Sequence, residues 1–244
     1  MNQQHPTRSL ALSALTMLLL SGTVAAADLP FGFVHHGDFR RIHHHGESSG
    51  KVDLSALSQA PGGWGLGALA GLRGEIVQVD GRLLVSRGSD PEGRVSPPAP
   101  DASAALFAGG RGAAWRDVSV PRGVDRQDFE AFVAEQAKAH GLDLDQPFPF
   151  RVEGRFPRLE WHVVTGAPSG PPGQGRPHAE RRLFRQDGER GQLVAIYTGA
   201  ALEGVVSHPG ERFHLHFVDA GITASGHVDH YEVAAGSILK LPIQ

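Results

Sequence analysis

Two histidine pairs, each with one residue between its members, are the groups in this chain most suited to chemistry. They are His43 with His45 and His214 with His216. Because the chain contains 14 histidines, about one such pair is expected by chance, and the spacing alone is weak support for a site. The chain has no cysteine, which excludes disulfides, thiolate ligands and cysteine nucleophiles. A metal site would therefore be built from imidazole and carboxylate groups.

The pair at 214 and 216 lies in a segment that alternates polar and apolar residues. Residues 213–218 read FHLHFV, a pattern that predicts a strand with His214 and His216 on one face and Leu215 and Phe217 on the other. On a strand the two histidines are about 6.6 Å apart, close enough to bind one ion at about 2.0–2.1 Å each. The alternative is two half-buried histidines on a sheet face, and the spacing favours neither interpretation.

A third histidine follows after a short connection. Residues 226–228 read GHV and begin another predicted strand. If this strand pairs with the preceding one as a hairpin, His227 lies opposite the pair. Three nitrogen ligands with one coordination position left open are typical of a catalytic zinc rather than a structural one.

The histidines near the N-terminus have a different context. His35, His36 and the run at residues 43–45 lie among glycine, serine and arginine residues. We interpret this cluster as a solvated loop, or as an adventitious metal binder, rather than as a built site.

Composition limits the scaffold that positions these groups. The 244 residues allow one large domain or two small ones. With 32 glycines and 17 prolines, the chain favours short elements joined by many turns over a long-helix bundle. The formal net charge of -3 gives no electrostatic footprint for nucleic acid, so we expect no nucleic-acid partner.

Residues 1–27 predict a secretory signal peptide. Arg8 supplies a positive start, residues 10–24 are apolar, and small residues at 24–27 suit cleavage after Ala26 or Ala27. The apolar stretch is shorter than the ~20 residues of a spanning helix, although an uncleaved anchor is the alternative. We expect a periplasmic or secreted protein with no membrane contact after cleavage.

Local patterns in the remaining chain predict mostly strands. Asp80-Gly81, between two apolar segments, suits the positive φ angles of a type I′ hairpin turn. Just before it, we expect the glycine-rich residues 62–67 to form a loop in which backbones pack closely. Residues 125–140 predict an amphipathic helix that ends at Gly141. Further strands are predicted over residues 147–164, 192–197, 213–218, 227–233 and 237–241.

Several of these segments resemble one known family. Residues 212–217 (RFHLHF) and 225–229 (SGHVD) resemble the zinc-ligand region of alpha-acetolactate decarboxylases. Residues 65–75 (GLGALAGLRGE), which run into 79–81 (VDG), resemble the family's glycine-rich start of a strand with a site glutamate. Residues 152–156 (VEGRF) resemble its second-domain opening strand, and the similarity covers roughly residues 33–241.

This resemblance implies an α+β fold. We expect two β-rich subdomains, built of mixed or antiparallel sheets with few helices, that form one cleft with a three-histidine metal site. The first subdomain spans residues 28–146 and contains Glu75, and the second spans residues 147–244 and contains the metal-binding histidines.

The resemblance also implies a reaction. Family members convert 2-acetolactate to acetoin and CO2 with zinc held by three histidines, which assigns His214, His216 and His227 as ligands. Loss of CO2 from a β-keto acid leaves an electron-rich enediolate that a Lewis acid stabilises. A carboxylic acid must then deliver a proton to carbon, and Glu75 matches the family's first active-site glutamate.

Three positions depart from the family pattern. The family arginine that holds the substrate carboxylate corresponds to His162, which lacks the two-pronged guanidinium geometry. Arg158 shares its strand face but is about 13 Å away. No counterpart of a second glutamate from the family's C-terminal tail is expected, and Ala68 replaces a threonine. Glu75 and His162 are the catalytic candidates.

Two function classes follow from these observations. The first is an exported zinc carboxy-lyase acting on a small 2-hydroxy-3-keto acid, with 2-acetolactate or a related compound as substrate. The second is a non-catalytic periplasmic protein that binds a metal or small ligand on the same fold. A cupin-like barrel also uses the His-x-His pattern, but its further ligands are poorly matched here. A homodimer is an alternative to a monomer.

Overall fold

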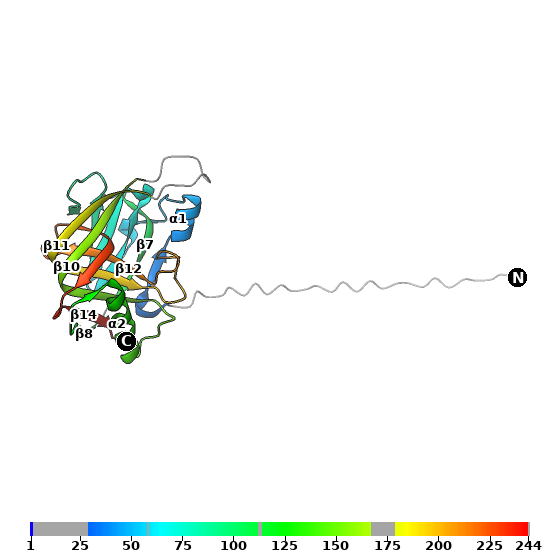
Figure 1. The fold of residues 1–244 in the computed structure, drawn as a ribbon. Coiled ribbons are helices and arrows are strands. Elements are labelled where there is room, and N and C mark those ends of the chain that lie inside the picture. The colour runs from blue at the N-terminus through cyan, green and yellow to red at the C-terminus, as the bar shows by residue number, and fades with distance from the viewer. Residues whose placement is uncertain (2–28, 58, 112–113, 167–178, 244) are drawn as a thin grey trace.

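Two antiparallel β-sheets make up most of the protein (Figure 1). The computed structural model describes Met1 and residues 29–57, 59–111, 114–166 and 179–243. Within this part of the chain two α-helices accompany the sheets, α1 (Phe39–His45) and α2 (Arg126–Ala139). The expected class, two β-rich units with few helices, is confirmed. None of the described helices is long and apolar enough to cross a membrane.

The first sheet comes from the N-terminal half. Its seven strands follow the order β1 (Val34–His36), β7 (Ser103–Arg111), β3 (Gly63–Leu69), β4 (Gly74–Val79), β5 (Arg82–Arg87) and β6 (Val95–Ser96), with β2 (Val52–Asp53) paired to β7. The β4–β5 hairpin is confirmed. Asp80 and Gly81 have φ angles of 48° and 81°, as a type I′ turn requires at both central positions.

The glycine-rich residues 62–67 were expected to form a loop, and this expectation is wrong. Most of them lie in β3, between β7 and β4. Gly65 and Gly67 pair with Gly109 and Phe107 of β7. A Cβ atom on Gly65 would clash with the Phe107 ring. Glycine is needed here because a neighbouring backbone and ring approach closely, a use that occurs in strands as well as loops.

The second sheet comes from the C-terminal half and closes on itself. Its order is β8 (Trp115–Ser119), β14 (Ile238–Pro242), β10 (Phe148–Gly166), β11 (Glu180–Tyr197), β12 (Phe213–Asp219), β13 (Ser225–Val233) and β9 (Val124–Asp125). In addition, β13 pairs with β10. Strands β10, β11, β12 and β13 therefore form a ring in which each has neighbours on both sides.

The helices have separate places in this scaffold. The predicted helix over residues 125–140 is confirmed as α2, which buries Phe129, Val133 and Ala137. It packs against β13 and β9 of the second sheet, in the lower part of the molecule in Figure 1, whereas α1 lies in the upper part.

The N-terminal histidine cluster is not the loop that we expected. His35 and His36 lie in β1, and residues 43–45 form the last turn of α1. The carboxylate of Asp38 accepts hydrogen bonds from the first free N–H groups of α1, those of Arg40 and Arg41. Gly46 ends the helix in the left-handed conformation. Capping interactions at both its N-terminus and its C-terminus stabilise this short helix despite its polar composition.

The two sheets pack face to face. Leu66 of the first sheet shares an apolar cluster with Ile196 of the second, and Val77 shares another with Val194. A buried hydrogen bond of 2.6 Å also joins them, from the Ser86 hydroxyl to the Ser225 carbonyl. This packing determines which residues of the first sheet face the histidines of the second.

The domain boundary placed between residues 146 and 147 stays a prediction. The last strand of the first sheet ends at Arg111, and Trp115 begins a strand of the second sheet. The predicted signal peptide, residues 1–27, lies outside the described residues apart from Met1.

Substituting Gly67 by alanine should test the close approach of β3 and β7. A Cβ atom at this position would fall on the backbone carbonyl of Leu106, with the carbonyl carbon at 2.8 Å. We expect Gly67→Ala to lower the free energy of unfolding by about 1–3 kcal/mol, measured from urea unfolding with an unchanged slope. Gly166→Ala is the control, because no atom lies within 4 Å of its added Cβ. Equal stability of the two variants would contradict the interpretation.

Candidate metal centre

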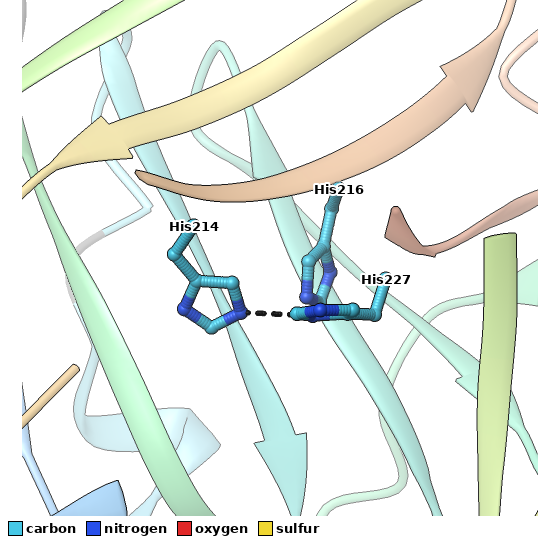
Figure 2. Close-up of side chains that lie close together, drawn as sticks. All are labelled: His214, His216 and His227. Carbon is cyan, nitrogen blue, oxygen red and sulfur yellow. Dashed lines mark hydrogen bonds between the residues drawn. The ribbon is translucent and has the colours of Figure 1, made fainter. Parts of the chain in front are cut away.

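Three histidine side chains of the second sheet converge on one point (Figure 2). One potential donor atom each from His214, His216 and His227 lies within 4.8 Å of the other two. The ring centroids are 5.0–5.6 Å apart. Among the described residues, this is the group of histidine and carboxylate side chains with a spacing suited to a metal ion. The structure thus brings together the three residues that the sequence predicted as ligands.

Strand alternation and hairpin register explain this convergence. His214 and His216 project from one face of β12, while Leu215 and Phe217 pack into the apolar core on the other. In the β12–β13 pairing, His216 lies directly opposite His227. Residues directly opposite in an antiparallel pair project to the same side, so the third imidazole meets the first two.

Hydrogen bonding sets the orientation of His214. Its Nδ1–H donates to the carbonyl oxygen of Val206 at 2.6 Å. The lone pair of Nε2 is therefore directed to the centre, 3.2 Å from Nδ1 of His227 (Figure 2). Metal-binding histidines typically have their second ring nitrogen held by such an acceptor.

Burial keeps these imidazoles in the form that binds metals. It lowers the pKa of His214 to about 3. Burial, with the neighbouring imidazoles, also holds the pKa values of His216 and His227 well below the usual range. Neutral imidazole is the metal-binding form.

The same packing leaves both ring nitrogens of His216 unsatisfied. Nδ1 and Nε2 are buried without a hydrogen-bond partner among the described residues, and each such group costs about 1–3 kcal/mol. A cation at the centre would remove this cost at the nitrogen that binds it. An all-nitrogen donor set fits zinc and other first-row divalent ions, so the residues present fit the metal that the sequence suggested.

Glu75 approaches this centre from the first sheet. It lies on β4, its side chain is 5% exposed, and its Oε2 is 3.7 Å from Nε2 of His216. Its Oε1 accepts a hydrogen bond of 3.2 Å from the Val164 N–H of β10. Burial raises its pKa to about 7, against the opposing effects of His162 and of the Val164 hydrogen bond. A carboxyl group with this pKa can donate or accept a proton near neutral pH.

His162 extends the row of histidines by one strand. It lies on β10 opposite His227 of β13, with the two ring centroids 4.9 Å apart. Its Nδ1–H donates to the Asp229 carboxylate at 2.8 Å. The structure therefore places His162 beside the three converging histidines, held by a carboxylate.

A cavity of about 240 Å³ connects these groups. Elements of both sheets and α1 contribute to its wall. Polar residues line one part, including His162, His214, His227 and Glu75, while Phe39 and Ile42 of α1 contribute apolar surface. The arrangement combines three histidines spaced to hold a metal ion, a carboxyl group with a raised pKa and room for a small organic molecule.

Four further residues of the cavity were not identified as site residues from the sequence. They are His43, Arg181, His208 and Asp229. Alternation could have identified Asp229, which lies two residues after His227 on the same strand. His43 was part of the cluster that we interpreted as solvated. Arg181 and His208 carry no local signal, because their places depend on strand pairing and sheet packing.

Comparison with known proteins identifies the family and the fold. A sequence model of the alpha-acetolactate decarboxylase family matches residues 42–242. The solved structure of alpha-acetolactate decarboxylase from Bacillus subtilis strain 168 is 20% identical with a TM-score of 0.70, over 87% of this chain and 86% of that chain. A Staphylococcus aureus protein of unknown function, similar to alpha-acetolactate decarboxylase, is 18% identical with a TM-score of 0.68, over 87% and 86% of the two chains. No curated protein matches in sequence. At these identities the structural likeness shows the fold.

Replacing His216 by alanine should abolish stoichiometric zinc binding. The change removes one of three nitrogen donors. Loss of a residue that only supports a metal ligand lowers metal affinity ~10–100-fold, so we expect a larger fall in zinc affinity here. The measurement is zinc titration with a competing chelator. Because burial keeps the wild-type imidazoles neutral, zinc should be retained as the pH falls from about 7.5 to about 5.5.

His230→Ala is the matched control, because His230 is exposed on the same strand, β13. It should bind zinc as the wild type does. Retained binding by His216→Ala, or equal loss in both variants, would show that the three histidines are not the ligands.

Proposed function

Because this chain belongs to the alpha-acetolactate decarboxylase family, we propose that it is a zinc-dependent carboxy-lyase that converts 2-acetolactate, or a related 2-hydroxy-3-keto acid, to a hydroxyketone and CO2. One observation carries the proposal. Glu75, buried and with a pKa raised to about 7, lines one cavity with His214 and His227 and lies 3.7 Å from His216.

The proposed metal has one role. When bound by His214, His216 and His227, zinc supplies a Lewis acid that offsets the negative charge remaining on the substrate oxygens as CO2 leaves. The β12–β13 pairing positions the histidines that would hold it.

Glu75 is the proposed source of the proton. The C–C bond to the carboxylate breaks, its electron pair stays on the substrate, and the carbon that lost CO2 must receive one proton. Oε1 of Glu75 is engaged by the Val164 N–H, so Oε2, on the side of His216, is the oxygen that holds the proton. With its pKa raised to about 7, Glu75 keeps this proton at a pH where an exposed glutamate has lost it.

His162 has a supporting part in this proposal. It lines the cavity beside His227, and Asp229 holds its Nδ1. A ring with a restricted orientation is suited to contact one group of the substrate. The carboxylate that leaves as CO2 is an anion that must be accommodated near this ring.

The buried glutamate favours catalysis over the alternative of a non-catalytic binding protein. Burying a carboxyl group costs free energy unless it has a partner. Neither metal binding by three histidines nor binding of a neutral ligand requires a carboxyl group at this place. Proton transfer to carbon requires a proton donor, a role that a buried carboxyl group can fill.

Replacing Glu75 by glutamine should greatly reduce turnover without loss of zinc. We expect acetoin release from racemic 2-acetolactate by the zinc-loaded protein to fall about 10²–10⁴-fold, the usual range for loss of a general acid. Zinc content should be unchanged, because Glu75 is not one of the three proposed ligands. The measurement is a colorimetric acetoin assay with metal analysis of the same samples.

Glu92→Gln is the control, since Glu92 is an exposed residue that pairs with Arg94. It should retain full activity. Stoichiometric zinc in the wild type without any acetoin above the level of His214→Ala would exclude the acetolactate reaction and favour the binding protein.

We also propose that the protein is exported and that residues 1–26 or 1–27 are removed. In a bacterial host, the exported form should have the mass expected after cleavage and should appear outside the cytoplasm. Leu19→Arg interrupts the apolar segment and should leave the full-length chain in the cytoplasm, whereas Gln4→Arg, outside this segment, should not. Export of an uncleaved chain would instead support an anchor.

A further inference from the structure

A carboxylate joins an arginine and a histidine at the wall of the cavity. Oδ1 of Asp229 accepts a hydrogen bond from Nη1 of Arg181 at 3.2 Å. Its Oδ2 accepts from Nδ1 of His162 at 2.8 Å. All three residues line the cavity that His214 and His227 also line. The set is therefore part of the proposed reaction chamber and not a surface ion pair remote from it.

Three neighbouring strands supply these residues. Arg181 lies on β11 opposite Val164 of β10, and Val164 is two residues after His162, on the same face of the strand. On the other side of β10, strand β13 carries Asp229 two residues after His227. The ring of strands thus directs the arginine, the carboxylate and the histidines to one side.

Arg181 is the one lysine or arginine among the described residues that line this cavity. A substrate that loses CO2 enters as a carboxylate anion. Taking that anion out of water is unfavourable unless a cation or several donors meet it. The cavity has no other permanent cation to do so among its described residues.

The contacts of Arg181 leave it able to bind a second anion. Guanidinium has five N–H donors in a planar fork, and Asp229 engages one of the two on Nη1. The Arg181 side chain is 48% exposed and that of Asp229 is 20% exposed. Asp229 therefore restrains the guanidinium at the cavity wall while other N–H groups remain accessible.

We propose that Arg181, positioned by Asp229, binds the carboxylate of the substrate. This inference rests on the proposed function for the identity of the substrate, since it concerns the same cavity. It assigns Arg181 to the recognition of acids, so that a neutral analogue of the same shape should not depend on this residue. A planar fork holds both carboxylate oxygens at once, whereas a lysine ammonium acts as a point charge.

The test compares an acid with its neutral analogue. Calorimetric titration of zinc-loaded protein would use 2-hydroxy-2-methylpropanoate, which lacks the keto group and does not decarboxylate, and 2-hydroxy-2-methylpropanamide. We expect Arg181→Gln to weaken binding of the acid by roughly 10–100-fold, the value of a hydrogen bond to a charged group. Binding of the amide should be unchanged. Arg181→Lys should give an intermediate loss for the acid.

Arg185→Gln is the matched control. Arg185 lies on the same strand, pairs with Glu160 at 3.6 Å, and is 76% exposed. It should leave binding of both ligands unchanged. Thermal unfolding of each variant would show that the fold is retained.

Three results would overturn the inference. They are no measurable binding of the acid by the wild type, unchanged binding of the acid in Arg181→Gln, and an equal loss for the acid and the amide. The binding measurement does not require turnover, so it separates this inference from the proposed function. Selective loss of acid binding in a protein that releases no acetoin would leave the role of Arg181 supported and the decarboxylase function refuted.

Discussion

The position of β13 between β12 and β10 is the constraint on which the rest of the site depends. It places His216, His227 and His162 side by side across three strands. Side-chain direction alternates with every residue of a strand, so a slip of one residue would turn His227 to the other face of the sheet. The ring of four strands resists such a slip, because each strand is paired on both sides. Rigid pairing is thus the source of the precision that a metal centre requires.

Burial acts on the two kinds of titratable group in opposite directions, and both effects suit the proposed chemistry. It lowers the pKa of the histidines and raises the pKa of Glu75 to about 7. In each case the neutral form is favoured, because a low-dielectric surrounding disfavours charge. Neutral imidazoles bind a cation, and a neutral carboxyl group holds a proton for transfer. The packing of the two sheets that excludes water is therefore part of the chemistry as well as of the stability.

The similarity to known structures shows the fold alone, so the proposed chemistry depends on the side chains of this chain. The relatives of known structure share about a fifth of their residues with this chain, and a shared fold does not by itself transfer an activity. What supports a decarboxylase here is the combination in one cavity of a candidate metal centre, a buried glutamate with a raised pKa and a permanent cation. Each of the three comes from a different part of the chain, on β12 and β13, on β4, and on β11.

The sequence alone determined those features of the structure that depend on residues close together in the chain. Alternation in residues 213–218 predicted the face that His214 and His216 share, and Asp80-Gly81 predicted the hairpin turn, because strand period and turn angles are local properties. The loop expected at residues 62–67 was wrong, because glycine marks close approach of backbones without saying whether the segment is paired. Only the tertiary structure decided that Glu75 faces His216 and that Arg181 meets Asp229. Those contacts depend on which strands pair and which sheet faces meet, and such long-range pairings leave no periodic pattern in the sequence.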